Sequence, residues 1–99
     1  MPFDKFGLGD AFADIALGTW RDAGVKPAVI ETPESYTGAA YIFIEDDTGN
    51  NAIIISPGAA ATISPADVQA QEALISGADI FITQLEQPMD AAMAALRIA

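Results

Sequence analysis

The spacing of hydrophobic residues changes several times along the chain, and each spacing predicts a different element. Large apolar residues recur every three to four positions between Ala11 and Ala23, which is the spacing of a helix. Asp10 is a suitable N-cap for this helix, and Gly24 is suited to the left-handed backbone that follows a helix end. The sequence therefore predicts a helix over about residues 11–23, followed by an extended connection that contains two prolines.

The next segment has the period of two that is typical of β-strands. Residues 38–44 and Ala52–Ile55 form two β-rich runs, joined by a polar turn cluster at residues 46–50. Both runs are apolar on both faces, whereas a half-solvated hairpin would be polar on one side. We therefore predict a β-hairpin within residues 36–58 that needs cover on both faces. The alternatives for this cover are the chain itself, a ligand and a partner subunit.

The second half of the chain predicts a helix, a buried strand and a second helix. Ser64 and Pro65 are suited to a helix N-terminus, and Gly77 ends that helix. The β-rich run over residues 80–85 predicts the strand, and Pro88 begins the last helix. The apolar face of this last helix, with two methionines as core residues, is expected to be formed by Met89, Ala92, Met93 and Leu96.

These elements predict an α/β fold that is incomplete by itself. The order is helix, hairpin, helix, strand and helix. Because one buried strand cannot form a parallel sheet alone, we expect the chain to be part of a larger or an intermolecular architecture.

Composition and charge narrow the classes of function. The 99 residues form one domain at most, with 4 basic residues against 14 acidic ones and a net charge of −10. This charge argues against binding to nucleic acids or to anionic membranes. The absence of cysteine and histidine removes thiolate chemistry and the commonest general base. No long apolar segment or signal peptide is recognised, which predicts a cytoplasmic protein.

Three sites carry residues that could bind a ligand or take part in catalysis. Glu86 follows the predicted buried strand, where it would bind sugar hydroxyls or a metal, or simply favour the N-terminus of the last helix. The Gly7–Asp10 sequence joins a glycine-rich turn to a helix N-terminus, so Asp10 is either a general base beside an anion site or an N-cap. The acids at residues 45–47 form a candidate cation site, although such a run at a turn is usually solvated.

The hairpin sequence resembles the lid of ribokinase-type carbohydrate kinases, also called phosphofructokinase-B-like kinases. The similar segments are Thr37–Ile44, Gly49–Ile55, Pro57–Ala59, Ile63–Val68, Gly77–Ile80 and Gln84–Pro88. Upstream, Gly9–Asp14 and Asp22–Val25 are similar to the helix that precedes the lid in this family. The resemblance covers about residues 9–99. It implies a single domain over residues 1–99 that is a fragment of a ribokinase-like fold, with the lid hairpin at residues 36–58.

The resemblance also implies a parent reaction and a set of site residues. The reaction is transfer of the γ-phosphoryl group of ATP to ribose or a similar sugar, with Mg²⁺ and a monovalent cation such as K⁺. The lid covers the sugar, and two lids clasp each other in a homodimer. By this resemblance, Ala40, Ile42 and Ile55 would contact the sugar, and Glu86 would accept a hydrogen bond from a sugar hydroxyl.

Several motifs of the family have no counterpart in this sequence. These are the first strand with its sugar-binding Asp, the Gly-Gly and Asn-x-x-Glu motifs, and the nucleotide-binding half. The register of the resemblance places Asp10 at the helix before the lid, so we expect a cap there and not the family's catalytic base. The chain by itself is therefore expected to be non-catalytic and to need no cofactor. The alternatives are a homodimeric module that binds a sugar or another small polar ligand, a complementing half of a split kinase, and a minimal enzyme that uses Asp10.

Overall fold

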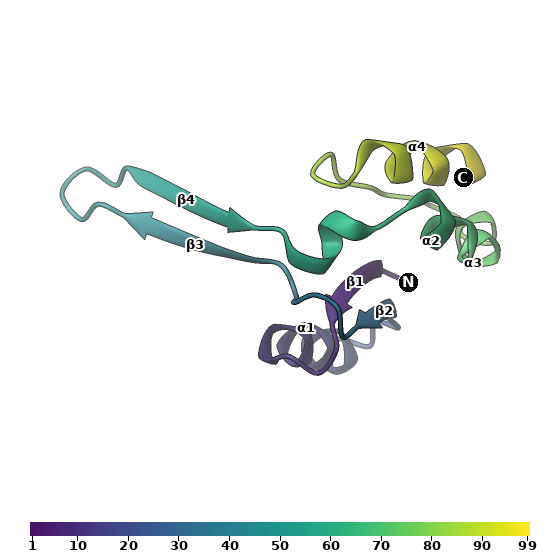
Figure 1. The fold of residues 1–99 in the computed structure, drawn as a ribbon, viewed down its shortest axis with the longest axis horizontal. Coiled ribbons are helices and arrows are strands. Elements are labelled where there is room, and N and C mark those ends of the chain that lie inside the picture. Colours follow the sequence, from purple (N-terminus) through teal and green to yellow (C-terminus); the bar gives the residue numbers. More distant parts are fainter.

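Two short sheets and a group of helices make up the fold, in a computed structural model that describes residues 1–99. Strands β1 (Phe3–Gly7) and β2 (Ala28–Thr32) are parallel neighbours connected through helix α1 (Ala11–Asp22), so they form a βαβ unit. Strands β3 (Ala39–Ile44) and β4 (Asn51–Ser56) form an antiparallel hairpin. The hairpin projects away from the remaining elements (Figure 1), and the molecule measures 49 Å along its longest axis.

Helix α1 begins and ends as the sequence predicts. Asp10 Oδ1 accepts a hydrogen bond from the backbone N–H of Ala13 at 2.9 Å, which caps the helix, and Gly24 follows its end with a φ of +75°. Ala13 is fully buried, and Trp20 stacks on Phe6 of β1 with 5.7 Å between the ring centroids. These contacts hold α1 against β1.

The parallel pair of β1 and β2 corrects the sequence-based expectation, which has no strand before α1 and only an extended connection after it. Asp4 and Lys5 interrupt the apolar pattern of β1, and β2 is a run of five residues that is too short to show a clear period. The two strands pair in register from Phe3 opposite Ala28 onward. The chain thus has a parallel sheet built from strands that the hydrophobic pattern does not reveal.

A second unit of short helices follows the hairpin. It comprises the 3₁₀ helix η1 (Gly58–Thr62) and the helices α2 (Pro65–Gln69), α3 (Glu72–Ser76) and α4 (Met89–Ile98). Helix α4 packs against both α2 and α3. None of the helices has the length and apolar character needed to cross a lipid bilayer.

The region predicted as one helix over residues 64–76 is divided into α2 and α3. The N–H of Gln71 bonds to the carbonyl of Val68 at 2.9 Å, a tighter i→i−3 turn, and Gln71 itself has φ −105° and ψ 16° outside the helical region. No glycine or proline stands at this break, so the sequence offers no signal for it.

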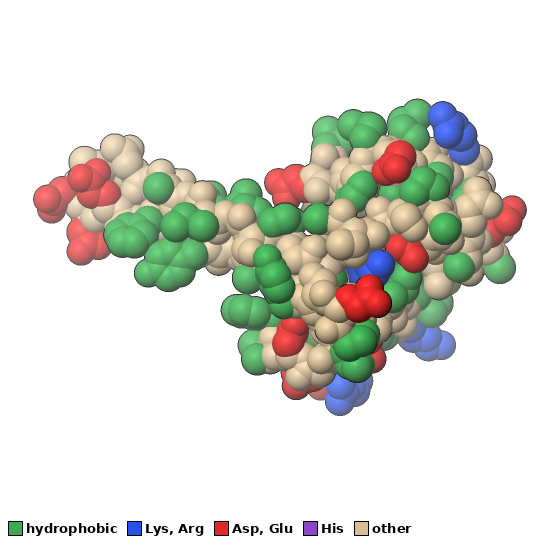
Figure 2. Space-filling view, viewed as in Figure 1, with side chains coloured by type: hydrophobic (Ala, Val, Ile, Leu, Met, Phe, Trp, Pro, Cys, Tyr) green, Lys and Arg blue, Asp and Glu red, His purple; other side chains and the backbone are tan.

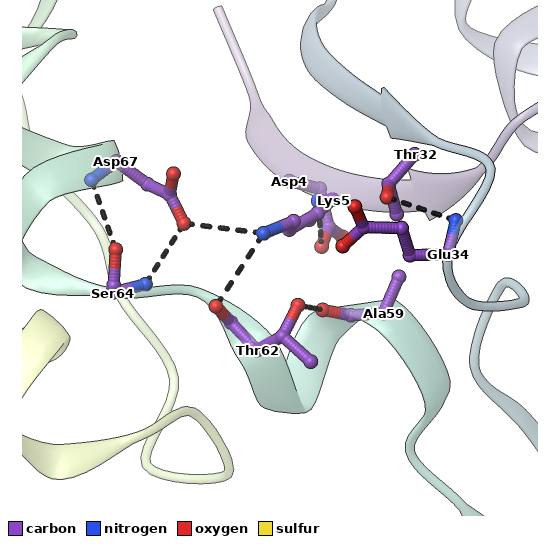
Figure 3. Close-up of polar contacts among 8 residues, drawn as sticks. All are labelled: Asp4, Lys5, Thr32, Glu34, Ala59, Thr62, Ser64 and Asp67. Carbon is purple, nitrogen blue, oxygen red and sulfur yellow. Dashed lines mark hydrogen bonds and ion pairs between the residues drawn. The ribbon is translucent and has the colours of Figure 1, made fainter.

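Helix α2 begins at a capping box that is also a junction with β1. Asp67 N–H donates to Ser64 Oγ at 3.2 Å, and Ser64 N–H donates to Asp67 Oδ2 at 3.0 Å. The Lys5 ammonium lies 3.4 Å from the same Asp67 oxygen and donates to the carbonyl of Thr62 at 3.5 Å. Figure 3 shows these contacts, which join the βαβ unit to η1 and α2.

The hydrophobic core lies among α2, α3 and α4, and it is small for a chain of this length. Only 11 of the 99 residues are buried. Five of them form one cluster, against which Phe3 and Phe81 pack from outside. The members of the cluster are Ile63, Val68, Ile75, Ala91 and Ala95.

The buried face of α4 consists of alanines, which corrects the predicted face. Of the four residues expected there, only Ala92 is buried, whereas Met89, Met93 and Leu96 are 64%, 40% and 50% exposed. Alanine side chains allow two helices to approach closely, and the longer side chains are left outside that contact. The methionines are therefore not core residues.

Residues 80–85 do not form the predicted buried strand. Ile80, Ile82 and Leu85 are each more than three-quarters exposed, and β1 has β2 as its only partner in the sheet. A mainly apolar pocket of about 580 Å³ lies between this segment, α3, α4 and the start of β1. A strand needs a neighbouring strand for its backbone hydrogen bonds, and residues 1–99 place none beside this segment.

Candidate functional site

The hairpin brings three of the four predicted site residues together. Ala40 and Ile55 lie directly opposite each other in the β3–β4 register, and Ile42 lies two positions further along β3 on the same face. Ile42 pairs with Ile53, and Ile44 completes this side of β3. We call these five residues the site face, and all five side chains are exposed.

The opposite side of the hairpin is also apolar, as the sequence predicts. It carries Tyr41, Phe43 and Ile54, and the rings of Tyr41 and Phe43 are 5.7 Å apart and inclined at 58°. We call these three residues the aromatic face. Every large hydrophobic residue on both faces is more than half exposed, and Figure 2 shows apolar atoms along the projecting hairpin. Residues 1–99 therefore do not cover the hairpin themselves, so its cover would come from a ligand, a partner subunit or polypeptide outside these residues.

The hairpin ends in an acidic turn. Gly49 adopts a φ of +73°, and the N–H of Glu45 bonds to the carbonyl of Asn50 at 2.8 Å. Glu45, Asp46 and Asp47 are all exposed, and their acidic atoms lie at the tip of the hairpin in Figure 2. No group of three or more acidic, histidine or cysteine side chains is arranged to hold a metal ion. These observations agree with the interpretation of this run as a solvated turn.

The Gly7–Asp10 turn has two of its backbone amides engaged within the chain. The N–H of Gly7 donates to Thr37 Oγ1 at 3.0 Å, and the N–H of Leu8 donates to the carbonyl of Thr32 at 2.8 Å. These two amides are therefore not available to bind an anion.

Asp10 is the cap that the register predicts and is poorly suited to act as a general base. Its carboxylate accepts hydrogen bonds from the backbone N–H groups of Ala13 and Thr37, at 2.9 and 2.7 Å. These bonds hold the pKa of Asp10 below its usual value, which makes the carboxylate a weaker base. Its negative charge at the start of α1 would also repel a phosphate.

Glu86, the fourth predicted site residue, lies in a bend between residues 80–85 and α4. Its side chain is exposed. The N-cap position of α4 is Pro88, and no side chain caps this helix, so Glu86 does not serve as its cap. In Figure 1 the loop before α4 lies at the end of the helical unit that is nearer the hairpin.

Sequence reasoning missed the joint at the base of the hairpin, which comprises residues 36–38 and 56–59. Tyr36 OH lies 2.7 Å from Ser56 Oγ, and the carbonyl of Tyr36 accepts the N–H of Ala59 at 2.7 Å. A Cβ atom on Gly38 would lie 2.5 Å from the Pro57 carbonyl oxygen, so only glycine fits this crossing. A glycine on each side of the hairpin, at positions 38 and 58, is the sequence signal for this joint.

Two relatives match almost the whole chain in sequence. The ribokinase of Schizosaccharomyces pombe is 38% identical over 91 residues, and the ribokinase of Staphylococcus aureus is 37% identical over 92 residues. Each match covers 91% of this chain but only 28% and 30% of the two relatives. The chain thus spans less than a third of the length of these relatives. No protein-family model matches it.

Two solved structures have the same fold as this chain, and in each case nearly the whole chain matches less than a third of the solved structure. The crystal structure of Sa239 has a TM-score of 0.85 and 35% identity, over 95% of this chain and 31% of that one. The ribokinase from Giardia lamblia has a TM-score of 0.79 and 26% identity, over 97% of this chain and 28% of that one. The predicted α/β class and ribokinase-like fold are thereby confirmed. The chain therefore belongs to the ribokinase-type carbohydrate kinase family and corresponds to a segment of its members.

Proposed function

We propose that this chain supplies the substrate lid and a substrate-binding carboxylate of a kinase that phosphorylates ribose or a similar sugar with ATP. The observation that carries the proposal is the site face, where Ala40, Ile42 and Ile55 lie together on a hairpin that residues 1–99 leave uncovered. The relatives named ribokinase support the choice of sugar and of reaction.

The two parts of the site have different roles. The apolar site face would lie against the C–H groups of the sugar and exclude water from it. Glu86 has an exposed carboxylate that no helix cap uses, so it is free to accept a hydrogen bond from a sugar hydroxyl. Such a bond orients the sugar but transfers no phosphoryl group.

Phosphoryl transfer itself is assigned to groups outside residues 1–99. The reaction depends on positioning and stabilising the phosphates, for which basic side chains, backbone amides and Mg²⁺ are used. This chain has four basic residues, of which Lys5 is engaged by Asp67, and the negative charge of Asp10 at the Gly7–Asp10 turn would repel a phosphate. ATP, Mg²⁺ and a monovalent cation such as K⁺ would therefore be bound elsewhere, and residues 1–99 alone are expected to be inactive.

The aromatic face is assigned to a second copy of the chain. Tyr41 and Phe43 would be covered when two hairpins pack against each other, while both site faces remain free for sugar. This arrangement gives each apolar face of the hairpin a different occupant, which is why a homodimer fits the two-faced pattern.

A second candidate function is that of a complementing part, which acts only together with a further polypeptide segment. The apolar pocket of about 580 Å³ and the exposed segment over residues 80–85 favour this candidate. A segment that filled the pocket would cover Phe81 and Ile82 and give the unpaired backbone a partner. A chain that aggregates or lacks fixed tertiary structure when purified alone would favour this candidate over an independently folded module.

Methyl-resolved NMR with ribose tests the proposed function directly. Ribose is expected to shift the methyl signals of Ala40, Ile42 and Ile55, whereas Ile54 on the aromatic face serves as the internal control. Equal shifts at Ile54, or none on the site face, would contradict the lid role. ATP turnover with ribose above a protein-free blank, lost in Asp10→Ala, would contradict the assignment of the chemistry to groups outside this chain.

A further inference from the structure

The two carboxylate oxygens of Asp10 bind two different parts of the chain. Oδ1 accepts the N–H of Ala13 in the first turn of α1, and Oδ2 accepts the N–H of Thr37. Thr37 is 27 residues away in sequence and lies two residues before β3 begins at Ala39. A helix cap needs only one oxygen. The second bond therefore ties the start of α1 to the first strand of the hairpin.

Thr37 closes a ring of contacts with the end of β1. Its side chain is buried, and its hydroxyl accepts the N–H of Gly7 at 3.0 Å. A Cβ atom on Gly7 would meet Asp10 Oδ2, and would also lie 2.7 Å from Tyr36 Cα, so the ring closes only around glycine. The end of β1, the start of α1 and the base of the hairpin are thus held to one another through Thr37 and Asp10.

The second strand of the hairpin takes its direction from the first. The carbonyl of Tyr36 accepts the N–H of Ala59, and the hydroxyls of Tyr36 and Ser56 are 2.7 Å apart. A Cβ atom on Gly58 would clash with the Tyr36 carbonyl oxygen, which shows how closely the backbone before β3 approaches the backbone after β4. A contact that fixes the direction of β3 at Thr37 therefore also fixes the direction of β4.

We propose that Asp10 is a positioning residue for the hairpin: its Oδ2 accepts the N–H of Thr37, and this bond sets the direction in which the hairpin leaves the βαβ unit. Without this bond the hairpin keeps its own ladder but loses its fixed direction relative to α1. The consequence for covering a sugar rests on the proposed function, whereas the positioning itself is independent of any ligand.

Asp10→Ser separates the positioning role from the capping role. Serine is among the best N-cap residues, but its single hydroxyl leaves no second oxygen for Thr37. Asp67→Ser is the matched control, since Asp67 also accepts a backbone N–H at a helix start but lies in the capping box of α2, away from the hairpin. The chain has no cysteine, so spin labels attach only at introduced Asp22→Cys and Asp47→Cys, on α1 and at the hairpin tip.

The measurements are the label-to-label distance distribution and the hydrogen exchange of the Thr37 amide. In Asp10→Ser the distribution is expected to broaden, and the Thr37 amide to exchange about tenfold faster or more, because it loses a bond to a charged group. Asp67→Ser should change neither quantity. These readouts need no sugar, so their failure is distinct from failure of the proposed function.

Three outcomes would overturn the proposal. The first is an unchanged distance distribution in a folded Asp10→Ser protein. The second is equal broadening in Asp67→Ser, which would reflect general loosening. The third is loss of helix α1, measured by circular dichroism, in two variants. If Asp10→Ser loses α1, the measurements are repeated on Asp10→Asn. Loss of α1 in both variants would show that the carboxylate matters as a cap and not as a positioning group.

Discussion

The side chains of Lys5 and Asp67 form an ion pair between β1 and α2, with 3.4 Å between Nζ and Oδ2. The same carboxylate also accepts the N–H of Ser64 in the capping box, so it serves a helix start and a contact between two units at once. Both side chains are mostly shielded from solvent, at 16% and 24% exposed. The contact is consequently less screened by salt than a fully exposed pair.

Loss of the cap on α2 should destabilise the chain measurably. Ser64→Ala removes the hydroxyl that accepts the Asp67 N–H, and such a change typically costs about 1 kcal/mol. Chemical denaturation followed by circular dichroism would measure this loss. Ser76→Ala is the matched control, because Ser76 is exposed at the last position of α3. A cost at position 76 equal to that at position 64 would contradict a specific role for the capping box.

Stability should fall on acidification below about pH 4. Backbone hydrogen bonds lower the pKa of Asp10 and of Asp67 below the ordinary value of 3.8. Their stabilisation is present above that value and is lost as the pH falls through the lower pKa of the folded state. Burial raises the pKa of Asp4, which has the opposite sign: its contribution favours the folded state at low pH and is lost as the pH rises.

Two variants separate these opposing contributions. The free energy of unfolding, measured by denaturant titration across the acid range, should decline less steeply in Asp67→Asn than in the unaltered chain. It should decline more steeply in Asp4→Asn. A chain that becomes more stable on acidification, or an unchanged slope in Asp67→Asn, would refute the assignment.

Truncation to alanine should destabilise the chain strongly in the small core and only slightly in the exposed segment over residues 80–85. Ile63 is 4% exposed and belongs to the core cluster, so Ile63→Ala should cost about 2–5 kcal/mol. Ile82 is 85% exposed, so the same change there should alter stability by less than about 0.5 kcal/mol. Thermal unfolding of both variants would test this contrast. A large cost at Ile82 would restore the interpretation of residues 80–85 as a buried strand.

The proposed pairing of two hairpins should be sensitive to charge on the aromatic face. Tyr41→Asp would bury an unpaired charge between the copies, which costs about 3 kcal/mol or more and weakens the dimer about a hundredfold. Light scattering after size exclusion measures the mass directly. Asn50→Asp adds the same charge at the turn and should leave the dimer intact. If Tyr41→Asp remains dimeric, the aromatic face is not the interface.

The proposed sugar contact of Glu86 should depend on its charge. Glu86→Gln keeps the shape but replaces a charged acceptor by a neutral one, so ribose affinity should fall about tenfold. Titration calorimetry of ribose would measure this change. Glu72→Gln removes an exposed charge on α3 and serves as the control. Equal losses in both variants would indicate a general effect of net charge and not a contact with sugar.

Elements with a local signal were predictable from the sequence, and those that depend on a distant partner were not. Helix α1 has a cap at Asp10 and a left-handed Gly24, and the hairpin has alternation and a polar turn, so both were predicted within a residue or two. The β1–β2 pair and the state of residues 80–85 depend on which strands lie side by side. Period and propensity carry little information about such neighbours.

The same distinction holds within the site. Ala40, Ile42 and Ile55 share a face because the period of two and the length of the turn fix the register, so their grouping was predictable once the hairpin was. The bond between Asp10 and Thr37 spans 27 residues and depends on where the base of the hairpin lies relative to the start of α1. The sequence correctly indicated a cap at Asp10 but gave no sign of its second bond.

The acidic tip has a consequence for how copies of the hairpin associate. Strands β3 and β4 form a sheet by themselves, so each has one edge with unpaired backbone groups beside apolar side chains. Such edges are templates for in-register stacking into fibrils. In-register stacking would bring the carboxylates of Glu45, Asp46 and Asp47 from successive copies within about 5 Å of one another. Their mutual repulsion would disfavour extended aggregates of the hairpin, whereas the proposed face-to-face packing of two hairpins does not require such stacking.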